Sequence, residues 1–165
     1  MKTIARSRIQ FDVDTQMRDG IDGDTVSDYR DAMKAGAEFP PLVVFFDGTS
    51  YWLADGYHRW HAASEAGIES LKCDVKQGSK RDAILFACGA NAANGRRRTN
   101  ADKHRAVMTL LKESEWSSWS NRVIADRCGV SDMFVGKLRD QLQTVCSSPT
   151  TRRGADGKAR KAPER

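Results

Sequence analysis

The stretch YWLADGYHRWHAASEAG, residues 51–67, decides the fold of this chain. It opens with an apolar run typical of a strand, which Asp55-Gly56 interrupts. Alanines follow at helical spacing, and Gly67 supplies a natural helix stop. We therefore predict a strand, a tight turn and then a helix over residues 57–66. The small side chains of that helix would let it pack closely on a sheet.

The residues around this stretch complete a small mixed α/β domain. Residues 42–46, LVVFF, have the apolar character of a buried strand, and Asp47-Gly48 is a hairpin turn signal. Outside this hairpin we expect, in chain order, a strand within residues 4–13, a helix with Val26, Tyr29 and Met33 on one face, and a strand over 71–75. We place the end of this domain at residue 78.

The following residues are predicted to be helical up to residue 146. The candidate N-caps of successive helices are Ser79, Thr99 or Asn100, Ser120 and Ser131. Residues 147–165 hold six Lys or Arg and no large apolar residue, so we expect a basic tail that is disordered on its own. The predicted fold class is α+β, with a mixed α/β domain over 1–78, an all-helical domain over 79–146 and the tail.

Composition argues against several classes of protein. No apolar run approaches the ~20 residues of a membrane span. The start, MKTIARSRIQ, lacks the apolar segment of a secretory signal. The four cysteines form no CxxC pair, which argues against a zinc module and against a disulfide-built fold. We therefore expect a protein of a reducing cytoplasm that does not bind membranes.

The net charge of +5 is unevenly distributed along the chain. Residues 1–80 carry 10 Lys or Arg and 13 Asp or Glu, a balance of −3. Residues 81–165 carry 17 Lys or Arg and 9 Asp or Glu, a balance of +8. Clustered cations release counterions from nucleic acid, so the second half is the candidate binder of a polyanion. A solvated basic surface is the competing interpretation.

Residues 121–142 have the pattern of a helix-turn-helix. Ala125 is small where the two helices of that motif approach, and Gly129 follows where the turn needs a positive φ. The second helix of such a motif enters the major groove with its N-terminal residues first. We therefore predict binding of double-stranded DNA. The base-facing residues would be Ser131, Asp132, Met133 and Lys137, and the phosphate-facing residues would be Arg122 and Arg139.

The turn at Asp55-Gly56 is a candidate anion site. Gly56 allows close approach of the backbone, and the start of the following helix favours negative charge. Arg59 can donate two hydrogen bonds to phosphate oxygens, and His58 can donate or carry a proton. A structural turn capped by Asp55 is the competing interpretation. His61 lies three residues after His58, but no third ligand is apparent, so we predict no metal site.

The segment Gly56-Tyr-His-Arg-Trp-His-Ala62 resembles the Gly-x-Arg-Arg-x-x-Ala helix start of the ParB family, within the ParB/sulfiredoxin superfamily. Gln16-Met-Arg18 resembles the Gln-Pro-Arg element that follows the first strand of those proteins. The order of parts is also similar, namely a mixed α/β domain, connecting helices and a helix-turn-helix. The likeness covers residues 5–142 and looks closest to short ParB-like proteins of phages, plasmids and bacterial genomes.

This resemblance implies a nucleotide or phosphate pocket in the first domain. In ParB proteins the pocket binds CTP, and we expect Mg²⁺ to accompany the nucleotide. By position, the residues that would hold it are Gln16, Arg18, Gly56, His58, Arg59, Asn94 and Arg97. Asn94 and Arg97 correspond to a Glu-Asn-x-x-Arg element, with Ala93 at the Glu position. The resemblance thus implies a DNA-binding transcriptional regulator that senses a nucleotide and could form homodimers.

Two other functions stay open. One is an enzyme, namely a metal-dependent nuclease, a phosphotransferase or a nucleotide triphosphatase. Its candidate catalytic residues are Asp55, His58 and Arg59, with Asp12 or Asp14 as further ligands for Mg²⁺. The other is an interaction module whose basic tail binds a partner.

Overall fold

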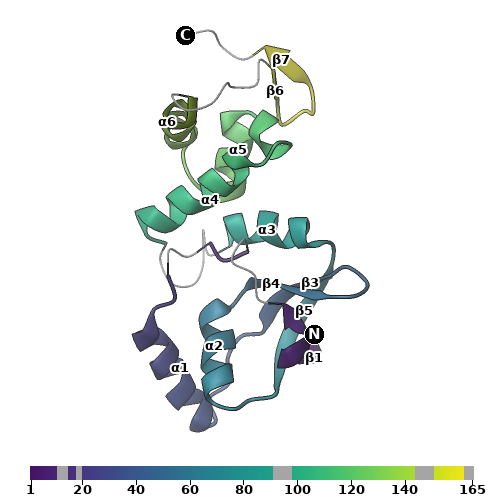
Figure 1. Ribbon diagram of the computed structural model, residues 1–165, viewed down its shortest axis with the longest axis vertical. Coiled ribbons are helices and arrows are strands. Elements are labelled where there is room, and N and C mark those ends of the chain that lie inside the picture. Colours follow the sequence, from purple (N-terminus) through teal and green to yellow (C-terminus); the bar gives the residue numbers. More distant parts are fainter. Residues whose placement is uncertain (11–14, 18–19, 91–97, 144–150, 162–165) are drawn as a thin grey trace. The chain divides into compact units, whose positions relative to one another are not determined.

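The computed structural model describes residues 1–10, 15–17, 20–90, 98–143 and 151–161 (Figure 1). The chain divides into two compact units, Met1–Ala87 and Cys88–Arg165. This division lies one helix later than the boundary predicted after residue 78. The reason is that helix α3 (Lys80–Gly89) packs on the sheet of the first unit, where Ala83 is fully buried and Phe86 contacts Phe45.

A five-stranded mixed sheet forms the centre of the first unit, in the order β1-β5-β3-β4-β2. Its strands are β1 (Lys2–Ala5), β2 (Ile9–Gln10), β3 (Leu42–Phe46), β4 (Tyr51–Asp55) and β5 (Ser70–Gln77). The β3–β4 hairpin is antiparallel, as the Asp-Gly turn predicts, and β3 also pairs with β5 in parallel. The α+β class and the small mixed domain are therefore confirmed.

The predicted single strand within residues 4–13 is wrong in detail. A short 3-10 helix, η1 (Arg6–Arg8), separates β1 from β2. The chain crosses from one edge of the sheet to the other at this 3-10 helix, so β1 pairs with β5 at one edge and β2 pairs with β4 at the other. Residues 11–13 lie outside the part of the chain that the structure describes.

Helices cover both faces of this sheet. Helices α1 (Gly23–Lys34) and α2 (Tyr57–Glu65) pack against each other on one face, and α3 lies on the opposite face (Figure 1). Between α2 and the sheet, Leu42, Val44 and Leu53 form the centre of an apolar cluster. Ala62 and Ala63 of α2 are fully buried, so the alanines predicted to allow close packing do so.

The second unit is mainly helical. Its elements are α4 (Asn100–Lys112), η2 (Trp116–Ser118), α5 (Asn121–Cys128), α6 (Asp132–Gln143), β6 (Thr151–Arg153) and β7 (Ala159–Lys161). Thr99 caps α4 in a reciprocal pair with Asp102, and the Ser120 hydroxyl accepts from the Val123 amide at the start of α5. Gly129, with φ of 60°, ends α5 in the left-handed conformation that the sequence predicts for this turn.

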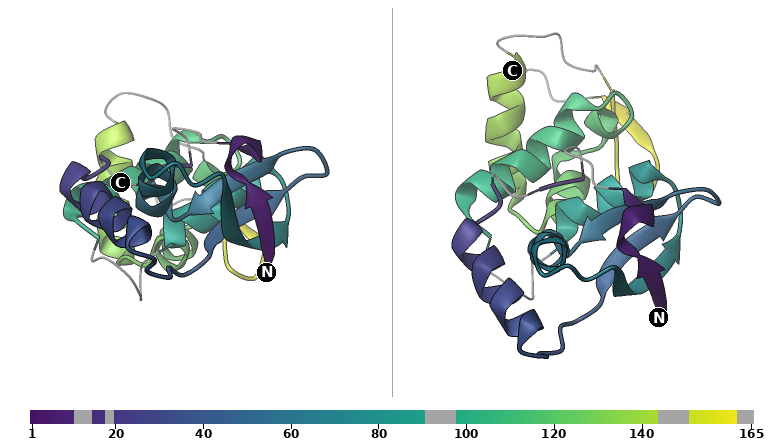
Figure 2. Two further views of the ribbon diagram at one scale, coloured as in Figure 1. Left: turned by 90° about the horizontal axis from the view of Figure 1, so that it is seen from below. Right: turned by 60° about the horizontal axis from the view of Figure 1, so that its bottom comes forward.

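The sequence predicts that the basic tail is disordered, but residues 151–161 of the tail contain two strands. Strands β6 and β7 form an antiparallel hairpin, drawn in yellow in Figure 2. Gly157 takes a positive φ of 73° beside Asp156, and the amide of Gly154 donates to the Lys158 carbonyl at 3.0 Å. The sequence prediction counted apolar residues and overlooked this Asp-Gly turn signal.

No described helix has both the length and the apolar character needed to cross a membrane.

Candidate nucleotide elbow and candidate nucleic-acid interface

The elbow, residues 55–59 between β4 and α2, depends on a glycine. Gly56 is the N-cap of α2 and has φ of 102°, in the left-handed region. A Cβ atom at this position would collide with the side chain of Leu42. Gly56 provides no side-chain cap for α2, and the first amides of a helix have no acceptor within the helix. The start of α2 therefore has the electrostatic character of an anion site.

Arg59 ties the elbow to the neighbouring chain. Its guanidinium donates to the Asp55 carboxylate at 3.1 Å and to the Pro41 carbonyl at 2.9 Å, and it also donates to the Pro40 carbonyl. The Arg59 side chain is only 16% exposed. These contacts give Arg59 a structural role in holding the turn, beside the phosphate-binding role expected from the sequence. A phosphate at the elbow would compete with protein acceptors for this side chain.

His58 connects α2 to α1. Its Nε2 accepts a hydrogen bond from the backbone amide of Asp22 at 3.2 Å. Asp22 is the N-cap of α1, because its carboxylate accepts from the amides of Asp24 and Thr25. Accepting at Nε2 places the histidine proton on Nδ1 in this arrangement. His58 therefore fixes the start of α1 next to the start of α2.

Tyr57 brings a distant segment to the elbow, a contact that the sequence prediction missed. Its hydroxyl is hydrogen-bonded to the Leu53 carbonyl at 2.7 Å and to the Thr15 hydroxyl. Since a phenol has one proton, donation to the carbonyl leaves the oxygen to accept from Thr15. Thr15 and the adjacent Gln16 are both buried. The structure thus places Thr15, the residue before the predicted nucleotide residue Gln16, in contact with the side chain of Tyr57.

The other predicted nucleotide residues are Arg18, Asn94 and Arg97, which lie outside the described residues. Arg98, which directly follows Arg97, is described by the structure and is buried. Its Nη1 donates to the Cys128 carbonyl at 2.6 Å, at the end of α5. Arg98 therefore stabilises the second unit from within.

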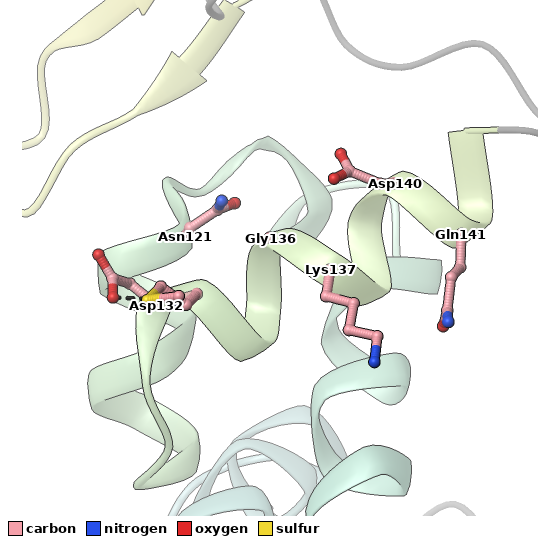
Figure 3. A pocket seen from close by; sticks show the side chains of 7 residues that line it. Asn121, Asp132, Gly136, Lys137, Asp140 and Gln141 are labelled. Carbon is pink, nitrogen blue, oxygen red and sulfur yellow. Dashed lines mark hydrogen bonds between the residues drawn. The ribbon is translucent and has the colours of Figure 1, made fainter.

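The second candidate surface is the exposed side of α5 and α6. A hollow of about 780 Å³ opens along it (Figure 3). Its lining residues are Asn121, Asp132, Met133, Gly136, Lys137, Asp140 and Gln141. Met133 is 82% exposed, which is unusual for a large apolar side chain. Ser131, Asp132, Lys137 and Arg122 are also exposed, so five of the six residues predicted to face DNA lie on the surface.

The prediction that Arg139 faces phosphates is wrong. Arg139 is only 4% exposed, because it shares the buried face of α6 with Val135 and Leu138. Its Nε donates to the Asn121 side chain at 3.0 Å, and its two terminal nitrogens donate to the carbonyls of Ser117 at 2.7 Å and Trp119 at 2.8 Å. Burial, reinforced by the nearby positive charge of Arg152, lowers the pKa of Arg139 to about 10.

Comparisons with known proteins agree with this architecture. The chain is 30% identical over 138 residues to the transcriptional regulator NovG of Streptomyces niveus, covering 84% of this chain and 42% of that regulator. This chain therefore spans less than half of its relative's length. Because the identity extends across both units, the likeness is not confined to the first domain.

Two solved structures share the fold. The C-terminally truncated chromosome-partitioning protein ParB of Caulobacter crescentus, complexed to the centromeric parS site, superposes with a TM-score of 0.57 at 16% identity, over 87% of this chain and 76% of that chain. The same protein complexed with CTP-gamma-S gives a TM-score of 0.50 at 16% identity, over 86% and 78% of the two chains. The ParB N-terminal domain family matches residues 1–92, which include the whole five-stranded sheet and the elbow, and the chain belongs to this family.

Proposed function

We propose that this protein is a ParB-like DNA-binding regulator in which α6 enters the major groove of duplex DNA. The observation that carries this function is the division of α6 into two faces. Val135 and Leu138 are buried, whereas Met133 and Lys137 are exposed on this helix, which follows the left-handed turn at Gly129. An exposed N-terminal half on the second helix of such a pair is the geometry used for contacts with base edges.

Each exposed residue of this surface has a distinct chemistry to offer. Lys137 can donate to guanine acceptors, the Asp132 carboxylate can accept from a cytosine amine, and Met133 can contact a thymine methyl group. Arg122 near the start of α5 suits a phosphate. NovG is a transcriptional regulator, and the Caulobacter ParB structure contains the parS site, which supports duplex DNA as the partner.

We also propose that the elbow binds the phosphates of a CTP-type nucleotide. The glycine-built start of α2, with no side-chain cap, fits a phosphate group. His58 and Gln16 would border the nucleotide, and Arg59 would exchange a protein acceptor for a phosphate oxygen. Arg18, Asn94 and Arg97 would complete the set by family position. The complex of Caulobacter ParB with CTP-gamma-S supports this choice of ligand, and Mg²⁺ would bind to the phosphates.

DNA binding is tested by fluorescence anisotropy with a mixed-sequence duplex pool. Lys137→Ala is expected to weaken binding and to change the sequences that are selected from the pool, because it removes a base contact. Lys112→Ala is the matched control, since Lys112 is an exposed lysine at the end of α4. Equal losses in both variants would refute α6 as the reading helix.

Nucleotide binding is tested by calorimetry with CTP, ATP and GTP, with and without the duplex pool. We expect CTP binding that His58→Ala weakens and that His104→Ala, on the exposed surface of α4, leaves unchanged. The absence of heat with every nucleotide, in both conditions, would refute the pocket and leave a DNA-binding protein. Mg²⁺-dependent cleavage of the duplex, lost in His58→Ala, would instead favour the enzymatic alternative.

A further inference from the structure

The β6–β7 hairpin, residues 151–161, is the most basic described segment outside the two candidate sites. It carries five Lys or Arg against a single carboxylate, Asp156. Arg153, Lys158, Arg160 and Lys161 are exposed. We propose that this hairpin is a second contact to duplex DNA, a wing that binds phosphates beside the site read by α6. This inference rests on the proposed DNA-binding function.

The wing is attached to the start of α5. The amide of Ser120, the N-cap of α5, donates to the carbonyl of Arg153 at 2.8 Å. Trp119 and Arg153 also form a parallel β-bridge. The next residue along the chain, Asn121, lines the hollow of α6, and its amide nitrogen would lie 3.2 Å from a Cβ atom at Gly136. Backbone bonds therefore hold the wing one residue from the candidate DNA surface.

Arg139 fixes the position of the wing relative to α6. From α6 it donates to the Asn121 side chain and to the carbonyls of Ser117 and Trp119. The same Trp119 forms the bridge to Arg153. Figure 3 shows the pale yellow hairpin strands on the Asn121 side of the hollow. A single buried side chain thus connects the reading helix with the segment on which the wing is anchored.

The charges within the wing are divided between holding its shape and facing outward. Arg160 binds both carboxylate oxygens of Asp156, at 3.0 and 2.6 Å, and this ion pair closes the turn. Arg153 and Lys158 are exposed on either side of that turn, and Lys161 is exposed at the end of β7. Phosphates repeat along a duplex at short spacing, so a basic hairpin next to a groove-reading helix has charge complementarity with the flanking backbone.

The test is the salt dependence of DNA binding by the full chain. The double variant Arg153→Ala/Lys158→Ala removes two outward-facing cations. Each lost phosphate contact should reduce the slope of log K against log salt by about 0.9, so the slope should fall by about 1.8. Between 50 and 200 mM KCl, this change corresponds to a roughly 12-fold smaller loss of affinity than in the wild type. Sequence preference should be retained, because these residues contact no bases.

Two further variants separate the wing from general charge effects. Lys112→Ala/Arg127→Ala removes the same charge from exposed positions on α4 and α5, and its slope should stay closer to that of the wild type. Gly157→Val keeps every charge but strains the turn at a positive φ, and it should weaken binding by opening the hairpin. Circular dichroism of each variant checks that the helices are intact.

The outcomes separate the wing from the proposed function. A wild-type slope in Arg153→Ala/Lys158→Ala, with DNA binding intact, would overturn the wing and leave the reading helix standing. An equal slope change in the Lys112→Ala/Arg127→Ala control, or wild-type affinity in Gly157→Val, would overturn a fixed wing in favour of diffuse charge. A wild-type chain that binds no duplex would refute the proposed function itself, and with it the wing.

Discussion

Arg139→Ala should destabilise the second unit by about 3 kcal/mol. The substitution leaves the partly buried carbonyls of Ser117 and Trp119 without their donor. An acceptor left unsatisfied by burial costs ~1–3 kcal/mol, and partial burial places these two in the lower half of that range. The Asn121 side chain, which is also partly buried, loses a donor as well and adds to this cost. Loss of the desolvated charge, whose pKa burial lowers to about 10, offsets part of the cost. A unit of this size has a total stability of ~4–12 kcal/mol, so the loss is large.

Urea and thermal unfolding, followed by tryptophan fluorescence, measure this effect, since two of the four tryptophans, Trp116 and Trp119, lie in the second unit. The melting temperature should fall by an amount on the order of 15 °C. Arg122→Ala removes the same charge from an exposed position and should cost less than about 0.5 kcal/mol. Arg139→Lys should be intermediate, because an ammonium cannot reproduce the planar fork. If Arg139→Ala were as stable as Arg122→Ala, the three hydrogen bonds would not hold this unit together.

Three further predictions concern the first unit. Gly56→Ala should lower the free energy of unfolding by about 2–4 kcal/mol, because the new Cβ strains the backbone and collides with Leu42. Gly67→Ala, at φ of 76° with open space around it, should lower it by only about 1–2 kcal/mol. Similar urea midpoints for the two variants would contradict the steric account. Tyr57→Phe should increase amide hydrogen exchange at Thr15 through loss of the hydroxyl contact, and unchanged protection would refute that role. Burial lowers the pKa of His61, so the unfolded chain takes up the proton first and stability should fall as the pH drops below about 6.5. His61→Gln should reduce this loss in urea titrations at neutral and acidic pH, and an identical pH dependence would count against it.

Local sequence signals predicted the elements that depend on backbone conformation. Gly56 and Gly129 occupy left-handed positions at the two turns that the sequence identified. Ser120 caps the start of α5, as its residue type predicts. These features involve neighbours within a few residues, so composition and spacing are enough to find them. The β3–β4 hairpin follows from the same kind of information, an apolar run and an Asp-Gly turn.

Contacts between distant residues were not predictable in the same way. Nothing in the sequence indicates that Tyr57 reaches Thr15 or that His58 accepts from the amide of Asp22. The error at Arg139 has a more specific origin. Helical spacing puts it on the face of Val135 and Leu138, and the sequence interpretation gave its charge more weight than this periodicity.

The same error affects the meaning of the charge count. The excess of +8 over residues 81–165 includes Arg98 and Arg139, whose guanidinium groups bind backbone carbonyls inside the second unit. It also includes Arg160, which neutralises Asp156 within the wing. A polyanion would therefore meet a smaller charge than the count suggests, carried by exposed residues that include Arg122, Lys137 beside the hollow and the cations of the wing. The buried arginines act indirectly, since they hold the surface on which the exposed cations are arranged. Formal charge thus predicts a polyanionic partner, while burial decides which cations would be available to bind it.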